Sequence, residues 1–189
     1  MSTAPVLDPT ASSDAPRASD ARATPQRVSA SLIGYLMGPA AFVLILVLRA
    51  YGLVADVATW VWVAVFILVP ATSIVADIAY RRRPSHARLC GRIALHCAAV
   101  TVAIYLTGWG PVLTGAYAFV ALENLAHDGS RTWRITLAWS MVGIVVGQVA
   151  IWQEWMPSFL STKNALALSV MGAFVLGFVI RMAGAAWEQ

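Results

Sequence analysis

The chain has 189 residues, of which 59% are hydrophobic and 12% are charged, and its formal net charge is +4. The charged fraction is about half that of an ordinary soluble domain, which argues against a soluble globular protein. Apolar runs recur along the chain at about the 20-residue length that crosses a hydrocarbon core. Because backbone groups in lipid must be satisfied within their own segment, these runs predict an all-α, polytopic membrane protein.

The first 29 residues differ from the rest of the chain. They are rich in Ala, Ser, Pro, Thr, Asp and Arg, and they contain no aromatic residue. Such a segment cannot bury enough apolar surface to offset the entropy lost on ordering, so residues 1–29 are expected to form a disordered cytoplasmic tail. The first apolar run begins near Leu32, too late and too long for a cleaved signal peptide.

Six membrane-spanning helices are expected to follow, forming a bundle within residues 30–182. Their approximate ranges are 31–48, 54–80, 92–106, 111–128, 133–152 and 164–181. The short segment TGWGP predicts a tight hairpin between the third and fourth helices. Pro39 and Pro70 lie inside expected spans and should kink them.

The basic residues predict the orientation of the bundle. If the tail, the loops near 81–92 and 127–134, and the C-terminus share one side, that side holds eleven basic residues and the other holds only Arg49 and Lys163. Basic residues accumulate on the cytoplasmic side, so both termini are expected in the cytoplasm and the chain in the plasma membrane. The basic loops could also attract anionic lipid headgroups, or they could only fix the topology.

The end of the chain is expected to continue the sixth helix into the cytoplasm. Residues 183–189 contain three alanines and no proline, which favours a cytoplasmic exit helix. Alternatively, Arg181 could extend its side chain to the membrane interface and mark the end of the span.

Small residues indicate how the helices pack, because close approach of backbones drives helix association in lipid. One face of the fifth helix is made of small residues at spacings of four and three, and shorter patterns occur in the sixth and first helices. The fifth helix contributes Thr136, Ser140, Gly143, Gly147 and Ala150, the sixth contributes Ser169, Ala173 and Gly177, and the first contributes Gly34 and Gly38. The contacts could be within one chain or between two, so a homodimer is an open alternative.

Four polar side chains within the expected spans are candidates for ligand binding or sensing. Asp77 precedes Arg81 by four residues, which predicts an interfacial ion pair. His96 lies about one turn inside the third helix and needs a partner or a function. Glu123 and His127 share a face of the fourth helix and are the expected partners of His96. The alternative is that all four make only structural hydrogen bonds.

No enzyme, metal or cofactor is predicted from this chain. His86, Cys90 and Cys97 lie on the same half as the four candidates, but their spacing matches no known zinc motif. The sequence contains no HExxH, P-loop or Rossmann glycine pattern. The only expected partners are the lipid bilayer, a possible second copy and a cytoplasmic signalling domain, with no nucleic acid among them.

The arrangement resembles the multi-helix membrane input regions of actinobacterial signalling proteins. The resemblance rests on the Pro/Ala/Ser-rich tail, six spans with cytoplasmic ends, short loops and the exit segment FVIRMAGAAWEQ. Proteins of this kind include diguanylate cyclases with GGDEF and EAL domains, adenylate cyclases and sensor histidine kinases. The resemblance implies a membrane anchor or sensory input domain that relays a signal through its C-terminal helix to a cytoplasmic output domain absent from these 189 residues.

Two other functions remain open. A small stand-alone membrane protein could act as a partner or assembly factor. The other is a transporter-like protein or a lipid-handling enzyme; a transporter would fit the kinked first and second helices, although the internal duplication typical of transporters is not evident.

Overall fold

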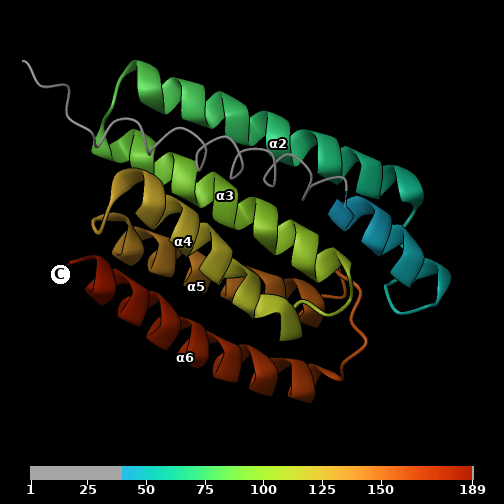
Figure 1. Cartoon of the computed structure of the whole chain (residues 1–189). Coiled ribbons are helices and arrows are strands. Elements are labelled where there is room, and N and C mark those ends of the chain that lie inside the picture. Colours follow the sequence, from blue (N-terminus) through green and yellow to red (C-terminus); the bar gives the residue numbers. More distant parts are fainter. Residues whose placement is uncertain (1–39, 189) are drawn as a thin grey trace, which may run out of the picture. The chain divides into compact units, whose positions relative to one another are not determined.

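Helices make up most of residues 40–188, which are the residues described in this computed structural model (Figure 1). No strand occurs in that range, and the all-α prediction is confirmed for it. The predicted tail, residues 1–29, and the first nine residues of the first expected span lie outside the described residues, as does Gln189.

Four of the helices are long and apolar enough to cross a membrane, which indicates a multi-pass membrane protein. These four are α2 (Thr59–Arg82), α3 (His86–Leu106), α5 (Thr132–Trp152) and α6 (Thr162–Trp187). The remaining helices are the apolar helix Ala40–Ala50, the 3-10 helix η2 (Val112–Ala116) and α4 (Tyr117–Asp128).

The fourth expected span is divided into two helical segments. Its first turns form the 3-10 helix η2, and only the 12 residues of α4 are α-helical. Thr114 and Gly115 lie in these first turns and are weak helix formers, and 3-10 turns are common at the start of α-helices. α4 alone is therefore shorter than a membrane span.

Helix α3 begins at His86, six residues before the predicted start at Arg92. The Ser85 side chain caps this end by accepting a 3.3 Å hydrogen bond from the backbone N–H of Arg88. The predicted range of the third span begins at Arg92, because Arg92 is counted with the basic residues of the 81–92 loop. Arg92 instead lies inside α3, where it is buried and forms ion pairs with Asp77 of α2 and Asp128 of α4, so its charge does not end the helix.

Helix α6 is uninterrupted from Thr162 to Trp187 and passes Arg181 without a break. Its first turn is capped by the Ser161 side chain, which accepts a hydrogen bond from the backbone N–H of Asn164. Near its other end, Ile180 and Gly184 are buried against the rest of the bundle.

Helices α4 and α5 lie at the centre of the packing, because each contacts the other and both α3 and α6. Tyr117 and Ala121 of α4 are buried and belong to one apolar core with Ile93 of α3 and Ile180 of α6. Helix α2 packs only on α3 among the long helices, and Trp62 is its single buried residue. α2 thus exposes most of an apolar surface.

Three loops are joined at the end of the bundle where α3 and α5 finish. The backbone N–H of Ala55 donates to the carbonyl of Thr107, and that of Phe159 donates to the carbonyl of Gly108. The indole of Trp109 donates a 2.7 Å hydrogen bond to the Leu53 carbonyl, and its ring lies 5.2 Å from the Phe159 ring. Gly108 has a φ of 85° and no side chain, which leaves room for Phe159.

Candidate functional site

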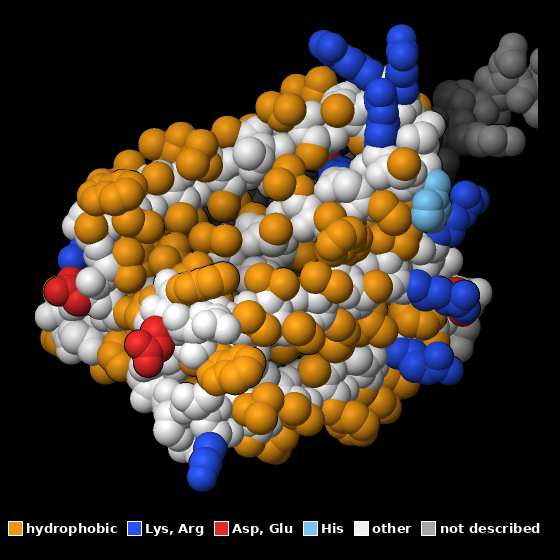
Figure 2. Space-filling view, turned by 180° about the vertical axis from the view of Figure 1, so that it is seen from behind, with side chains coloured by type: hydrophobic (Ala, Val, Ile, Leu, Met, Phe, Trp, Pro, Cys, Tyr) orange, Lys and Arg blue, Asp and Glu red, His pale blue; other side chains and the backbone are white. Residues whose placement is uncertain are grey.

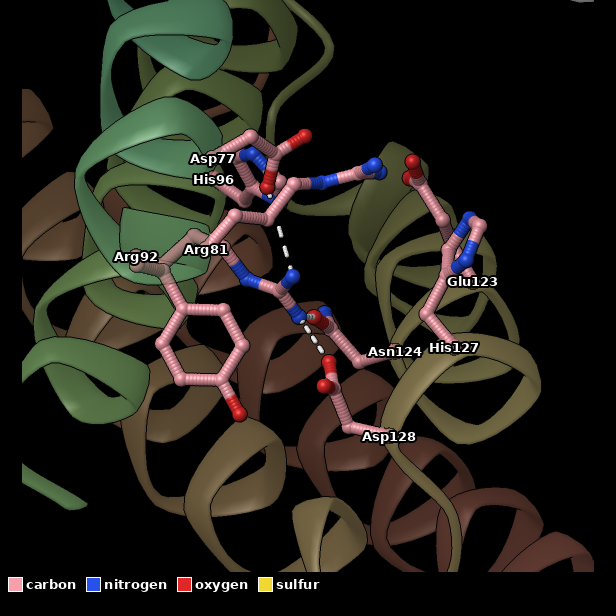
Figure 3. Close-up of a pocket in the computed structure, with 9 residues that line it drawn as sticks. Asp77, Arg81, Arg92, His96, Glu123, Asn124, His127 and Asp128 are labelled. Carbon is pink, nitrogen blue, oxygen red and sulfur yellow. Dashed lines mark hydrogen bonds and ion pairs between the residues drawn. The ribbon is translucent and has the colours of Figure 1, made fainter. Parts of the chain in front are cut away.

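A polar cavity of about 210 Å³ lies at the opposite end of the bundle, between α2, α3 and α4 (Figure 3). It brings together all four of the sequence candidates. The first and the last of them, Asp77 and His127, are 50 positions apart in the chain. The lining residues are Asp77, Tyr80 and Arg81 of α2, Arg92 and His96 of α3, and Glu123, Asn124, His127 and Asp128 of α4.

Arg92 is the central cation of this cavity and is only 7% exposed. Its guanidinium donates to Asp77 Oδ1 at 3.3 Å and to Asn124 Oδ1 at 2.7 Å, and it forms an ion pair with Asp128. It also lies 5.0 Å from the centre of the Tyr80 ring, within the range of a cation–π contact. One side chain therefore connects α3 to both α2 and α4.

Asn124 is held in one orientation by a second hydrogen bond. The residue is 1% exposed, and its side-chain amide donates a 2.7 Å bond to the Val120 carbonyl one turn earlier in α4. The amide oxygen is consequently turned toward Arg92. A buried amide in this arrangement satisfies the guanidinium without adding charge.

His96 lies one turn beyond Arg92 and differs from it in having no polar partner. Both ring nitrogens are shielded from solvent, and neither forms a hydrogen bond with any of residues 40–188. The expected partners Glu123 and His127 line the same cavity but form no hydrogen bond with His96 in that range. Leaving a buried donor or acceptor unsatisfied costs about 1–3 kcal/mol, so His96 is the residue of this cavity whose polar atoms lack the compensation that Arg92 and Asn124 have.

The cavity is deep on one side and open on the other. Arg92 and Asn124 are buried at its base, whereas Arg81, Glu123 and His127 are exposed. In Figure 3 the Arg81 side chain points toward the Glu123 carboxylate. The ion pair predicted between Asp77 and Arg81 is not among the ion pairs of the described residues, because the Asp77 carboxylate pairs with the buried Arg92 instead.

Charge in the cavity is nearly balanced. Three carboxylates, from Asp77, Glu123 and Asp128, face two arginines, so the formal charge is −1 when both histidines are neutral. One added proton or one monovalent cation would neutralise the cavity. Among residues 40–188, no group of three or more His, Cys, Asp or Glu side chains is arranged to hold a metal ion.

No protein-family model, curated protein or solved structure matches this chain. The assignment of a site therefore depends on the geometry of the cavity and on the membrane-spanning helices around it.

Sequence reasoning missed Arg92, Asn124 and Asp128, although a helical pattern connects them to the candidates. Arg92 and His96 are four residues apart, as are Asn124 and Asp128, so each pair shares one helix face. The sequence places Arg92 at the start of a span. Arg92 is buried because α2 and α4 pack around its side chain, and the sequence near Arg92 does not indicate which helices are its neighbours.

The five small residues of α5 lie buried within this chain, and two of them, Gly143 and Gly147, face tyrosine rings. A methyl group added at Gly143 would come within 2.5 Å of Thr101 Oγ1 and of the Tyr117 hydroxyl. A methyl group at Gly147 would overlap the Tyr105 ring. The tyrosine hydroxyls are bonded across the bundle: Tyr117 shares a 2.7 Å hydrogen bond with Thr101, and Tyr105 donates to the Ile144 carbonyl at 3.2 Å. The buried residues of the stripe are Thr136, Ser140, Gly143, Gly147 and Ala150.

The small residues of α6 have mixed surroundings. Ser169 is buried and donates a 2.9 Å hydrogen bond to Gln148 of α5. Ala173 is partly buried against the core. A methyl group added at Gly177 would lie at ordinary contact distance from Leu137 and Met141. Gly34 and Gly38, predicted to pack the first helix, lie outside the described residues.

Proposed function

We propose that this chain is a membrane input domain with six spans and both termini in the cytoplasm. The four long helices would be completed by a first span that includes Ala40–Ala50 and by a fourth made of η2 and α4 together. Residues 112–128 cover about 25 Å at the helical rise of 1.5 Å per residue, which is close to the thickness of a thin hydrocarbon core.

The distribution of charge supports this orientation. Figure 2 shows a broad hydrophobic surface, with most Lys and Arg side chains gathered at one end of it. That end carries the polar cavity, the α2–α3 turn and the α4–α5 turn. By the positive-inside rule it faces the cytoplasm, and the loops that contain Tyr51 and Trp155 face outward.

The polar cavity is the proposed sensing site, and the observation that carries this proposal is His96. An imidazole whose two shielded nitrogens have no partner among residues 40–188, in a cavity with three carboxylates, is a costly arrangement, and such groups within membrane helices commonly mark a functional site. The cavity would respond to protonation or to a small polar ligand from the cytoplasm, since its exposed mouth is on that side.

A short connection links the cavity to the end of α6. Asp128 is the last residue of α4, and after a turn at Gly129, with a φ of 75°, α5 begins at Thr132. The next residue, Trp133, packs on Gly184 of α6, where an added methyl group would come within 2.6 Å of its ring. The Trp133 indole also donates a 3.4 Å hydrogen bond to Glu188. A displacement of Asp128 would thus move Trp133 and, through it, the C-terminal turns of α6.

The proposal is tested by attaching a diguanylate cyclase or adenylate cyclase domain after Gln189 and measuring its product. We expect His96→Ala and Glu123→Gln to change the output while the protein remains folded and inserted. A matched control is Gly91→Ala in α3, since a side chain there would meet open space. If both cavity variants keep the output of the parent and only lower its stability, the cavity is structural and the stand-alone membrane protein becomes the better interpretation.

A further inference from the structure

The net positive charge of the described chain is located at one end of the bundle. The end with the polar cavity holds eight arginines and four acidic residues, whereas the opposite end holds Arg49 and Lys163 against Asp56 and Glu154. At that opposite end Arg49 is paired with Asp56 at 2.6 Å. The contrast shows an excess of cations at one end that residues 40–188 do not neutralise.

Six of the eight arginines are exposed and lie outside the cavity. None of them forms an ion pair with any of residues 40–188. We call them the arginine face, and they are Arg82, Arg83, Arg88, Arg131, Arg134 and Arg181.

Two members of the arginine face are held in place by contacts that leave their charge free. Arg88 donates a 2.9 Å hydrogen bond to the Ala79 carbonyl near the end of α2. Arg134 lies 5.2 Å from the centre of the Trp133 ring, a cation–π distance. Their guanidinium groups are therefore ordered before any partner binds, which lowers the entropy lost on binding.

Exposed apolar residues adjoin the arginine face. Ile78 lies one turn before Arg82 on α2, and Phe178 and Met182 flank Arg181 on α6, each at least 45% exposed. Trp187, which is 53% exposed, ends α6 beyond them. Cations bordered by apolar side chains and tryptophan match the boundary between lipid headgroups and acyl chains.

We propose that the arginine face binds the phosphate groups of anionic phospholipids in the cytoplasmic leaflet. A guanidinium donates two parallel hydrogen bonds to a phosphate, and a headgroup such as that of phosphatidylglycerol brings a negative charge that the excess of arginine would neutralise. The adjoining apolar surface would hold the acyl chains. This inference rests on the membrane placement proposed above and is independent of the sensing role of the cavity.

The test compares lipid binding by the purified, detergent-solubilised chain, measured as retained lipid by native mass spectrometry. We expect phosphatidylglycerol to bind more tightly than phosphatidylcholine with the same acyl chains. Each arginine near a lipid surface contributes about 1 kcal/mol, so Arg82→Gln combined with Arg83→Gln should weaken phosphatidylglycerol binding by about thirtyfold. The control Lys163→Gln, at the opposite end, should leave it unchanged.

Three outcomes would overturn the proposal. The first is equal binding of the two lipids, and the second is an equal loss of binding in Lys163→Gln. The third is full displacement of phosphatidylglycerol by inorganic phosphate or by a short oligonucleotide, which would make the face a general anion site. Accessibility labelling of the same variants in membranes separates these outcomes from an error in membrane placement.

Discussion

The side-chain oxygen of Asn124 accepts a 2.7 Å hydrogen bond from the buried guanidinium of Arg92, 32 residues earlier in the chain. The bond joins α3 to α4 at the base of the polar cavity, and the same guanidinium pairs with Asp77 on α2. Three helices are therefore held together by one cation. Loss of that cation would leave the partly exposed carboxylates of Asp77 and Asp128 without this partner.

We expect Arg92→Gln to destabilise the bundle strongly. Removing one partner of a fully buried ion pair typically costs about 3–5 kcal/mol, and the loss should be at or below the lower end of this range here because the Asp77 and Asp128 side chains are 37% and 16% exposed. Arg92→Lys should recover only part of the loss, since an ammonium cannot match the spread of a guanidinium toward Asp77, Asn124 and Asp128. Thermal unfolding in detergent, followed by the tryptophan signal, measures both. Wild-type stability in Arg92→Gln would contradict the assigned network.

Replacing His96 with leucine should have the opposite effect on stability. The substitution removes two buried nitrogens without a hydrogen-bond partner, each of which costs about 1–3 kcal/mol, and it conserves most of the side-chain volume. We expect an unfolding temperature equal to or above that of the parent, together with loss of the response to pH or ligand. A clear drop in unfolding temperature would indicate that His96 has a structural partner.

Gly147 and Gly177 offer a matched pair of glycine substitutions in neighbouring helices. Gly147→Ala places a methyl group inside the Tyr105 ring and should destabilise the bundle by about 1–3 kcal/mol through overpacking. Gly177→Ala finds neighbours at 3.9 Å and 4.0 Å and should be neutral or slightly stabilising. The prediction is tested by measuring the unfolding midpoints of the two purified variants and of the parent chain. Similar midpoints would mean that the α5 stripe does not pack as described.

The topology can be tested with single cysteines in a chain that lacks Cys90 and Cys97. Tyr51→Cys and Trp155→Cys lie at positions that are 77% and 76% exposed, in the loops proposed to face outward, and His86→Cys lies at the first residue of α3. A membrane-impermeant maleimide added to intact cells should label the first two and not the third. The reverse pattern would place the arginine face outside, contrary to the positive-inside rule.

Hydropathy predicted six spans, and four of the corresponding helices are long and apolar enough to cross a membrane, because that property needs little more than length and an apolar composition. The candidates Asp77, His96, Glu123 and His127 could be identified because polar residues are rare in such runs, and all four line one cavity. What the sequence could not provide was the pairing between helices. The local ion pair expected of Asp77 and Arg81 gave way to a contact with Arg92, fifteen residues along the chain.

The small residues of α5 illustrate a similar limit. Their spacing predicted a tight contact, and the expected cause was close approach of two backbones. In the structure, the space above Gly143 and Gly147 is filled by the side chains of Tyr117 and Tyr105. The spacing of small residues along the sequence predicts where another part of the protein packs closely on the helix. It does not identify the side chain or backbone that packs there.

The central claim is that the polar cavity and the C-terminal turns of α6 are energetically coupled. Amide hydrogen exchange of residues 181–188, compared between the parent chain, His96→Ala and the control Gly91→Ala in lipid nanodiscs, tests it most directly. We expect His96→Ala to alter exchange in this segment, through Asp128 and the contact of Trp133 with Gly184, and Gly91→Ala to leave it unchanged. Altered exchange that is confined to the cavity residues of α3 and α4, with residues 181–188 as in the parent, would contradict the claim.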